Sequence, residues 1–487
     1  MIFSAVSVII DIINVFSNTL KLILNKKGDL ILKLPDISRL FGIGGARTFK
    51  GGIHPDDMKT NTCEKPIIDL PGPDVAVFPM QQHIGAPCKP CVKVGERVFM
   101  GQLIGEAGGF VSANIHSSVS GTVKAIEPRM HPSGVMTESI VIENDGLDEM
   151  SPDISPNSSA SPSAKEIIDA VKKAGIVGMG GAAFPTHVKL SPPPDKKIEY
   201  VIVNGAECEP YLTSDHRAML ETSNEVIDGL KLIMRVFGLS EGYIGIETNK
   251  PDAIAHMREC AARETEVKIH VIPVKTKYPQ GSEKQLIDAI TGRRVPPGKL
   301  PMDVGAIVDN IDTCAAIARA VRLGTPLMRR IVTVSGDCIE NPLNFRVRIG
   351  TSFEYIIEKS GGFREDPAKI IMGGPMMGIA VPDISVPIIK GSSGILAFSR
   401  KMLVGSKEQS CLRCGKCVSG CPMHLLPNKL KEAADKEDIK GLDALHISDC
   451  IQCGSCTFVC PANQNPLQSI RTGKIKLNNL KREEVKN

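Results

Sequence analysis

The chain contains no tryptophan, and aromatic residues make up only 4% of its 487 residues. It also lacks any run of the ~20 consecutive apolar residues that a membrane-spanning helix needs. Its formal net charge of +4 is too small to indicate a nucleic-acid-binding surface. The first basic residue, Lys21, comes too late for the positively charged start of a secretory signal, so we expect the chain to stay in the cytoplasm.

The remaining composition is that of a folded protein with several domains. Apolar residues make up 42% and charged residues 23% of a chain that is too long for one hydrophobic core. Residues 471–487 carry six Lys or Arg against two Glu and thus account for the whole net charge. This basic tail is either a solvated terminus or a contact for an acidic partner or an anionic membrane surface.

The first 24 residues have the pattern of an amphipathic helix. Their polar residues recur at alternating spacings of three and four, which places them on one helical stripe: Ser4, Ser7, Asp11, Asn14, Asn18 and Lys21. Such a helix can lie in a membrane interface, dock on a partner helix or be buried within this chain, and the segment can also be translated from a misplaced start.

The rest of the chain alternates between recognisable patterns. Residues 67–142 are rich in Val, Ile, Pro and Gly and indicate a small β-domain, whereas Ser and Pro dominate residues 146–165 and indicate a solvated linker. Helix-period segments then alternate with the strand-like YVIVNG, EGYIGIET and VKIHVIPV, which predicts an α/β domain over about 163–322. Residues 330–400 suggest a compact β-rich module with one helix.

Two cysteine runs of the form C-x2-C-x2-C-x3-C-P provide the most specific signal. In two-cluster ferredoxins with this spacing, the fourth cysteine of each run binds the cluster of the other run. We therefore predict two [4Fe-4S] clusters: Cys411, Cys414, Cys417 and Cys460 for the first, and Cys450, Cys453, Cys456 and Cys421 for the second. A pair of zinc sites is the alternative, although such sites usually separate two C-x2-C pairs by a loop. The sequence between the runs looks helical.

The other seven cysteines are scattered. Cys88 and Cys91 form a C-x2-C pair without a second pair nearby, which favours surface thiols or a packed pair over a zinc site. Cys208 has no sequence neighbour that would make it redox-active.

A glycine-rich segment, GIVGMGGAAFPTHVKL at residues 175–190, is the second candidate site. Glycines allow close backbone approach, so that successive N–H groups of Gly178, Gly180 and Gly181 can face an anion such as a flavin phosphate. A tight turn without a ligand is the alternative.

Together with VNGAECEPYLTSDHR, YPQGSEKQLI and DNIDT, this segment resembles the flavin- and NADH-binding subunit of respiratory complex I. The resemblance implies an FMN pocket with Phe184 stacking and with polar groups for the ribityl and ribose hydroxyls. The remaining implied contacts are Asn204, Glu207, Glu209, Tyr278, Gly281 and Asn310. Met179, Ala206 and Ser282-Glu283 stand where complex I usually has Arg, Asp and a Glu pair, so the resemblance supports NAD(H) binding less than FMN binding.

A broader resemblance covers residues 49–460. FKGGIHP, then QQHIGAPCKPCVKVGERVFMGQ with HSSVSG, then the complex-I-like core and the double cysteine run look like the RnfC family of the Rnf/Rsx ion-translocating electron transport complex. The early β-domain is similar to a biotinyl/lipoyl-type barrel, but HSSVSG offers no lysine for a prosthetic group, so we interpret it as structural.

The expected multidomain α/β organisation is an N-terminal extension with an amphipathic helix (1–48), a barrel-sandwich domain (49–145), the linker (146–165), a flavin/NADH-binding-like α/β domain (166–325), a β-grasp (SLBB) module (330–400), a helical two-[4Fe-4S] ferredoxin domain (406–470) and the basic tail (471–487).

The resemblance implies a peripheral subunit on the cytoplasmic side of the cell membrane. It would pass electrons among ferredoxin, FMN or NAD(H) and integral-membrane partners that move Na+ or H+, and it would need no catalytic acid, base or nucleophile. Two alternatives remain: a soluble flavin/iron-sulfur reductase of the cobalamin-reductase type, and a cluster-bearing docking scaffold without flavin.

Overall fold

A computed structural model describes residues 45–156, 159, 161–403 and 407–486, together with one short strand pair before them. The chain divides into two units, Met1–Ala46 and Arg47–Asn487. In the first unit, β1 (Ile23–Leu24) and β2 (Leu30–Ile31) pair antiparallel. The amphipathic helix predicted for the first 24 residues lies outside the described residues. Among the helices of the described ranges, none is both long and apolar enough to cross a membrane.

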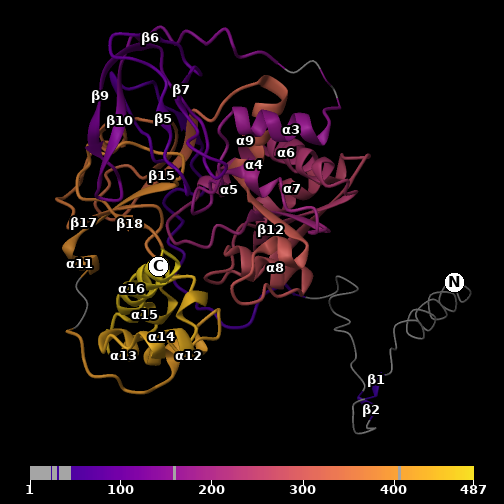
Figure 1. Ribbon diagram of the computed structural model, residues 1–487, viewed down its shortest axis with the longest axis vertical. Coiled ribbons are helices and arrows are strands. Elements are labelled where there is room, and N and C mark those ends of the chain that lie inside the picture. The colour runs from indigo at the N-terminus through magenta and orange to yellow at the C-terminus, as the bar shows by residue number, and fades with distance from the viewer. Residues whose placement is uncertain are drawn as a thin grey trace, which may run out of the picture. The chain divides into compact units, whose positions relative to one another are not determined.

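The second unit begins with a small β-barrel formed by two sheets (Figure 1). One is antiparallel in the order β4 (Val75–Pro79), β10 (Met136–Asn144), β9 (Gly121–Met130), β6 (Arg97–Val98). The other joins β5 (Lys89–Pro90), β7 (Leu103–Glu106) and β8 (Ile115–His116). Ile140 and Ile142, two residues apart on β10, share one face of the sheet and are fully buried, as is Phe78 of β4.

The hairpin of HSSVSG is buried in this fold. Ser117, Ser118, Val119 and Ser120 are at most 1% exposed. The Ser118 hydroxyl donates a hydrogen bond, 2.5 Å long, to the carbonyl of Ile349, which belongs to the later β-rich module. The hairpin therefore lies against the body of the protein.

Residues 146–165 are attached at several points, although their composition predicts a solvated linker. Met150 pairs with Met100 of the barrel, and the Asp148 carboxylate accepts two hydrogen bonds from Arg348, at 2.5 and 2.6 Å. Ser163 then caps helix α3 (Ala164–Lys173) in a capping box with Glu166. Most of the described side chains in this segment are exposed, as its composition indicates.

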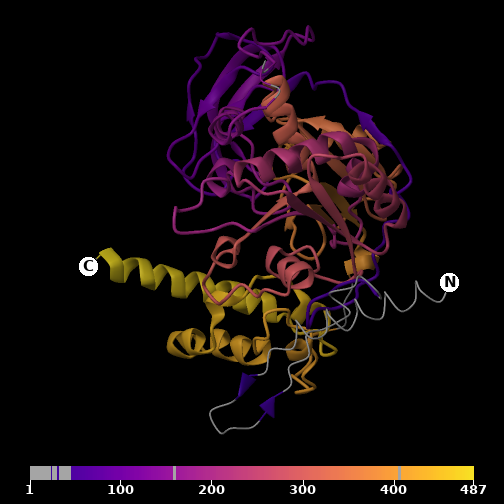
Figure 2. The same cartoon turned by 90° about the vertical axis from the view of Figure 1, so that its right-hand side faces the viewer.

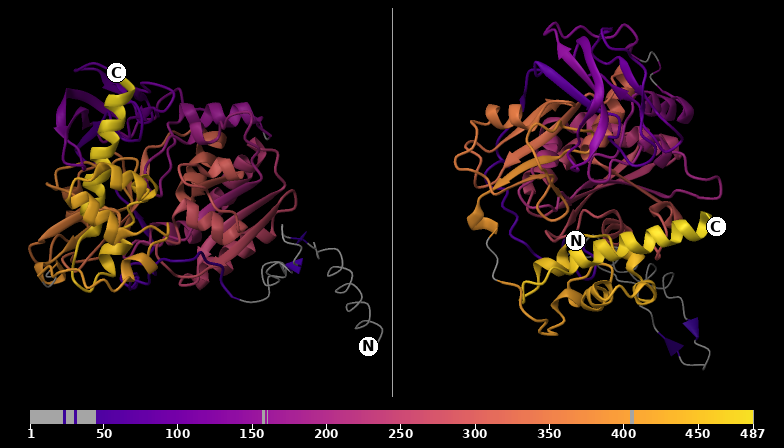
Figure 3. Two further views of the ribbon diagram at one scale, coloured as in Figure 1. Left: turned by 60° about the horizontal axis from the view of Figure 1, so that its bottom comes forward. Right: turned by 60° about the vertical axis from the view of Figure 1, so that its left-hand side comes forward.

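The α/β domain has a four-stranded parallel sheet in the order β13 (Lys268–Val274), β12 (Glu241–Glu247), β11 (Tyr200–Gly205), β14 (Ala306–Asn310). The three strands predicted from their apolar runs are confirmed, and such runs suit a sheet covered on both faces. Val201 and Val203 of β11 pack in the cluster that contains α6 (Ser223–Val236) and α9 (Ile311–Leu323), whereas Ile202 packs with α8 (Glu283–Thr291). Helices therefore lie on both faces (Figure 3). The remaining helices are α4 (Thr186–Lys189), α5 (Ser214–Glu221), α7 (Pro251–Ala262) and the 3-10 turn η1 (Pro301–Val304).

The β-rich module confirms the predicted strands and helix but includes a strand from far upstream. Its sheet runs β18 (Ile379–Ala380), β17 (Lys369–Met372), β19 (Gly394–Phe398), β15 (Arg329–Ser335), β16 (Leu343–Arg348), β3 (Ile67–Asp69). Helix α10 (Phe353–Lys359) packs on it, and α11 (Arg400–Leu403) follows it. The sequence indicated that β3 opens the early β-domain, but β3 pairs parallel with β16. This pairing could not be predicted, because three residues carry no pattern that identifies a distant partner.

The cysteine runs lie in a helical domain, as predicted. It consists of α12 (Lys416–Ser419), α13 (Pro427–Asp435), α14 (Ile439–Ala444), the turn η2 (Ile447–Asp449), α15 (Ser455–Phe458) and α16 (Pro466–Lys486). Helix α16 continues across the predicted boundary at 470, so the basic tail is largely helical (Figure 2). It does so because Ile470 and Leu477, two turns apart, are buried against Leu430, Leu442 and Ile447.

Candidate functional site

The fourth cysteine of the first run lies with three cysteines of the second. Cys421, Cys450, Cys453 and Cys456 line one cavity, which Leu425, Leu430, Leu467 and Ile470 close from the apolar side. Burial, with the neighbouring thiols, raises the pKa of Cys456 to about 12 and also raises the pKa of Cys421. Four soft donors in an apolar cavity fit a thiolate-bound cluster, which supplies the positive charge that the thiolates need.

The first run lies at the surface. Cys411 and Cys414 are exposed, whereas Cys417 is half-buried. The start of this run is held against the segment that follows Cys460: the Gln409 N–H donates to the Ala462 carbonyl at 2.9 Å, and the Gln464 amide donates to the Gln409 carbonyl at 2.8 Å. The half-buried Cys460 thus comes from a segment adjacent to the first three cysteines.

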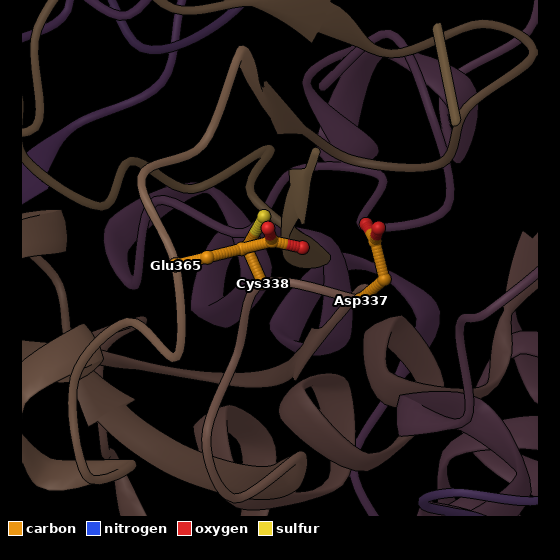
Figure 4. A group of neighbouring side chains, drawn as sticks. All are labelled: Asp337, Cys338 and Glu365. Carbon is orange, nitrogen blue, oxygen red and sulfur yellow. The ribbon is translucent and has the colours of Figure 1, made fainter. Parts of the chain in front are cut away.

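The cysteine sites do not have the geometry of single-ion sites. Four thiolates on one zinc ion, each about 2.3 Å from the metal, lie within about 4 Å of one another. In the described part of the chain, one group of three or more Cys, His, Asp or Glu residues has its ligand atoms within 4.8 Å of one another. It consists of Asp337, Cys338 and Glu365 (Figure 4). The Asp337 carboxylate already accepts hydrogen bonds from the backbone and hydroxyl of Ser399, and this group lies outside both cysteine runs.

The glycine-rich loop is fixed at its base and open at its tip. The Gly178 N–H donates to the Phe184 carbonyl at 2.8 Å, and the Met179 N–H donates to the Thr313 hydroxyl at 2.9 Å. Gly180 and Gly181 are exposed, and a Cβ built on Gly181 meets no atom within 4 Å. The loop therefore presents backbone to open space, as a phosphate-binding loop requires.

Two asparagines lie at the carboxyl edge of the parallel sheet, where ligands of such sheets usually bind. Asn310 ends β14 and caps α9, its amide donates to Asp215 at 2.6 Å, and it lies directly beside Gly180. Asn204 in β11 donates to the Gly281 carbonyl at 2.6 Å. The structure thus brings the glycine loop and Asn310 together, and it connects Asn204 to Gly281.

The two predicted acidic contacts already have partners within the chain. Glu207 accepts from the backbone N–H groups of Asp215, at 2.7 Å, and His216 at the start of α5. Glu209 accepts from the N–H groups of Met376, at 3.0 Å, and Met377, at 2.8 Å. Burial raises the pKa of Glu209 to about 7. Both carboxylates therefore hold neighbouring segments in place.

Tyr278 connects the two candidate sites. Its side chain is 1% exposed, and its hydroxyl donates to the carbonyl of Cys453 at 2.7 Å. It packs with Ile53 and Cys453 in one small apolar cluster that also contacts Cys208. Cys208 lies beside Gly281, and burial raises its pKa above the ordinary value. The flavin-pocket segment and the second cysteine set are therefore in direct contact.

Two residues that support this region have no signal in the sequence. The Lys59 ammonium, in a side chain 5% exposed, donates to the carbonyls of Glu209 and Leu212. Arg330 donates to the Met179 carbonyl at 3.1 Å and pairs with Asp312. No local pattern could have identified either residue, because both act on segments far away in the chain.

Comparisons with known proteins agree with this arrangement. Successive parts of the chain match the RnfC barrel sandwich hybrid domain (47–147), the Nuo51 FMN-binding domain (171–319), the SLBB domain (331–380) and the 4Fe-4S dicluster domain (410–464). These matches confirm the predicted fold class. They also confirm FMN and 4Fe-4S clusters as the cofactor types of these domains.

Curated relatives match most of the chain. The C subunit of the proton-translocating ferredoxin:NAD(+) oxidoreductase complex of Clostridium ljungdahlii is 50% identical over 392 residues, which cover 80% of this chain and 85% of that protein. The Na(+)-translocating counterpart of Acetobacterium woodii is 48% identical over 428 residues, covering 88% and 96%. The C subunit of the ion-translocating oxidoreductase complex of Rhodobacter capsulatus is 44% identical over 449 residues, covering 92% and 86%. Among solved structures, a chain of an NAD+-reducing [NiFe]-hydrogenase aligns with a TM-score of 0.46 at 19% identity, over 64% of this chain and 63% of that chain.

Proposed function

This chain belongs to the RnfC family, the C subunits of the ion-translocating oxidoreductase complexes, and on that premise we propose that it relays electrons between a flavin site and a surface cluster of such a complex. The relatives are named for ferredoxin:NAD(+) oxidoreduction coupled to proton or Na(+) translocation. We propose ferredoxin, NAD(H) and the membrane subunits as the partners of this chain, with the chain bound peripherally on the cytoplasmic side of the membrane.

The contact at Tyr278 is the observation that carries the relay. Tyr278 begins YPQGSEKQLI, one of the flavin-pocket segments, and its hydroxyl reaches the backbone of Cys453 in the second cysteine set. The Gly52 N–H adds a second attachment by donating to the Gly420 carbonyl at 3.2 Å, one residue before Cys421. Because the ferredoxin-like domain is held at these points, the second cluster is the one that would exchange electrons with the flavin.

We assign the cofactor contacts by this geometry. The N–H groups of Gly180 and Gly181 would hold the flavin phosphate, with Phe184 and Asn310 at the edge of the same loop. Cys421, Cys450, Cys453 and Cys456 would bind the inner cluster, and Cys411, Cys414, Cys417 and Cys460 the outer one. A bound flavin supplies the conversion between two-electron and one-electron transfer that such a relay needs.

The side chains of this site hold groups in place and exclude water. Glu209 fixes the backbone of Met376 and Met377, and Met376 in turn lies against Gly454 in the second cysteine run. Met179 (1% exposed) and Ala206 (fully buried) are uncharged residues at two positions where complex I usually has a charged one. We therefore expect these replacements to weaken NAD(H) binding relative to complex I.

Anaerobic purification with iron, sulfide and flavin measured in one sample tests this function. We expect eight iron atoms and one FMN per chain, as two [4Fe-4S] clusters and one flavin pocket require, and reduction of the protein by NADH or by reduced ferredoxin. Clusters without FMN, even after reconstitution, would favour the docking scaffold. Full flavin and cluster content in a chain that never associates with membranes would favour the soluble reductase.

A further inference from the structure

The two cysteine runs form loops with the same backbone but different surroundings. Arg413 and Gly415 of the first loop have φ of 53° and 73°, and the matching Gln452 and Gly454 of the second have φ of 57° and 80°. Position by position, Leu412 corresponds to Ile451 and Lys416 to Ser455. The repeat thus provides an internal comparison in which the fold is constant and the side chains vary.

The second loop is covered by its own chain. Ile451 packs against the cluster of Ile53, Tyr278 and Cys453, and Ser455 is fully buried. A Cβ built on Gly454 would lie 3.2 Å from the Met376 carbonyl. This loop carries no charge, which suits an interior contact.

The first loop has no such cover among the described residues. Leu412 is 65% exposed, and Arg413, Lys416 and the cysteines Cys411 and Cys414 are exposed as well. Within the part of the chain that the structure describes, neither cation of this loop has a carboxylate oxygen within 4.0 Å. The loop therefore presents an apolar side chain and two unpaired charges around two thiols.

Five other lysines of the ferredoxin-like domain contrast with this loop. Lys429 and Lys436 both pair with Glu432 at 2.9 Å, and Lys431 pairs with Asp435 at 2.7 Å. Lys476 and Lys481 of α16 are likewise paired with Glu437 and Asp443. These five lysines are thus neutralised within the chain, whereas the exposed Lys440 of α14 has no carboxylate partner among the described residues. Arg413 and Lys416 are therefore unusual in lying unpaired beside two exposed cysteines, and not in being unpaired.

We propose that the loop from Cys411 to Cys417 is the docking surface for another subunit of the same complex, which covers Leu412 with an apolar patch and faces Arg413 and Lys416 with acidic side chains. This inference rests on the proposed function, because it assigns the outer cluster as the point of electron exchange with that subunit. Tyr278 and Met376 cover the second loop from within the chain; the partner covers the first. Complementary charge favours encounter and fixes orientation at such a contact.

The test measures retention, not activity. The full-length chain, affinity-tagged, is bound to the detergent-solubilised remaining subunits, and the salt concentration that releases it is recorded. In the R413E/K416E variant, we expect at least about tenfold weaker binding at ~0.1 M salt, because like charges then oppose each other across the contact. The matched control K429E/K436E makes the same charge change on the paired face and should bind like the wild type.

A second variant separates apolar from charged contacts. Leu412→Ser should weaken retention at high salt as much as at low salt, because burial of an apolar side chain is not screened. Iron content and the two cluster EPR signals are measured in every variant and should stay unchanged.

Three outcomes would overturn the docking surface. In the first, R413E/K416E is retained on the remaining subunits as strongly as the wild type. In the second, the control K429E/K436E loses as much binding as R413E/K416E does. In the third, this loop binds an acidic soluble ferredoxin but the chain is not retained on the remaining subunits. A wild-type chain without clusters would instead contradict the proposed function, while the retention data would still decide the docking surface.

Discussion

Two neighbouring glycines of the candidate flavin loop should respond differently to the same substitution. A Cβ on Gly181 meets no atom within 4 Å, so Gly181→Val should change the stability of the fold by no more than about 0.5 kcal/mol. A Cβ on Gly180 would lie 3.0 Å from the side-chain nitrogen of Asn310. Displacing Asn310 would cost about 1 kcal/mol for the lost helix cap and a further ~1–3 kcal/mol for its buried bond to Asp215.

Both substitutions should nevertheless abolish tight FMN binding. A hydrogen bond from a backbone N–H to a charged phosphate contributes about 1.5–3 kcal/mol, so losing two of them amounts to ~3–6 kcal/mol. The FMN dissociation constant should therefore rise by roughly 10²- to 10⁴-fold in Gly181→Val, with an unchanged melting temperature. Titration of FMN into flavin-free protein, followed by fluorescence, measures the first quantity, and thermal unfolding the second.

Gly181→Ala is the matched control, because it adds only the first carbon and should lose less affinity than Val. If Gly181→Val binds FMN with wild-type affinity, the loop tip does not contact the phosphate and the pocket lies elsewhere.

Three further predictions concern the clusters and their connection to the pocket. Cys421→Ser should remove the same EPR signal as Cys456→Ser and not the one removed by Cys411→Ser; the reverse match would refute crossed ligation. Tyr278→Phe leaves a buried carbonyl without its donor and should destabilise the protein by about 1–3 kcal/mol in denaturant unfolding, an effect that a surface contact would not produce. For Glu209, burial raises the folded-state pKa from 4.5 to about 7, so the folded state keeps a proton that the unfolded state releases in this range. Stability of the flavin-free protein should therefore fall as pH rises from 4.5 to 7, by at most about 3 kcal/mol, and Glu209→Gln should remove this slope; parallel pH profiles of the two proteins would contradict the assignment.

Local patterns predicted the parts of this molecule that depend on local chemistry. The strands β11, β12 and β13 follow from continuous apolar runs, and the helical frame of the cysteine runs follows from the sequence between them. The pairing of Cys421 with the second run is consistent with the cavity that the structure shows, because the spacing of the run already directs the fourth cysteine away from the first three.

Contacts between distant segments could not be predicted in the same way. Lys59 bonds carbonyls about 150 residues later, and Tyr278 reaches Cys453 across 175 residues. Glu209, which stays a predicted ligand contact, accepts the backbone N–H groups of Met376 and Met377, 167 and 168 residues later. A sequence shows which groups are available for bonding, but only the fold decides which of them are already used.

Strand β3 affects how this chain is made. Its partner on β16 is joined to it by an ion pair between Asp69 and Arg346, which are 277 residues apart. At a synthesis rate of 5–20 residues per second, β3 leaves the ribosome roughly 14–55 s before that partner exists. During this time its edge is unpaired and open to wrong pairing, so the earliest part of the second unit must wait for a late part of the nascent chain before its folding can be complete.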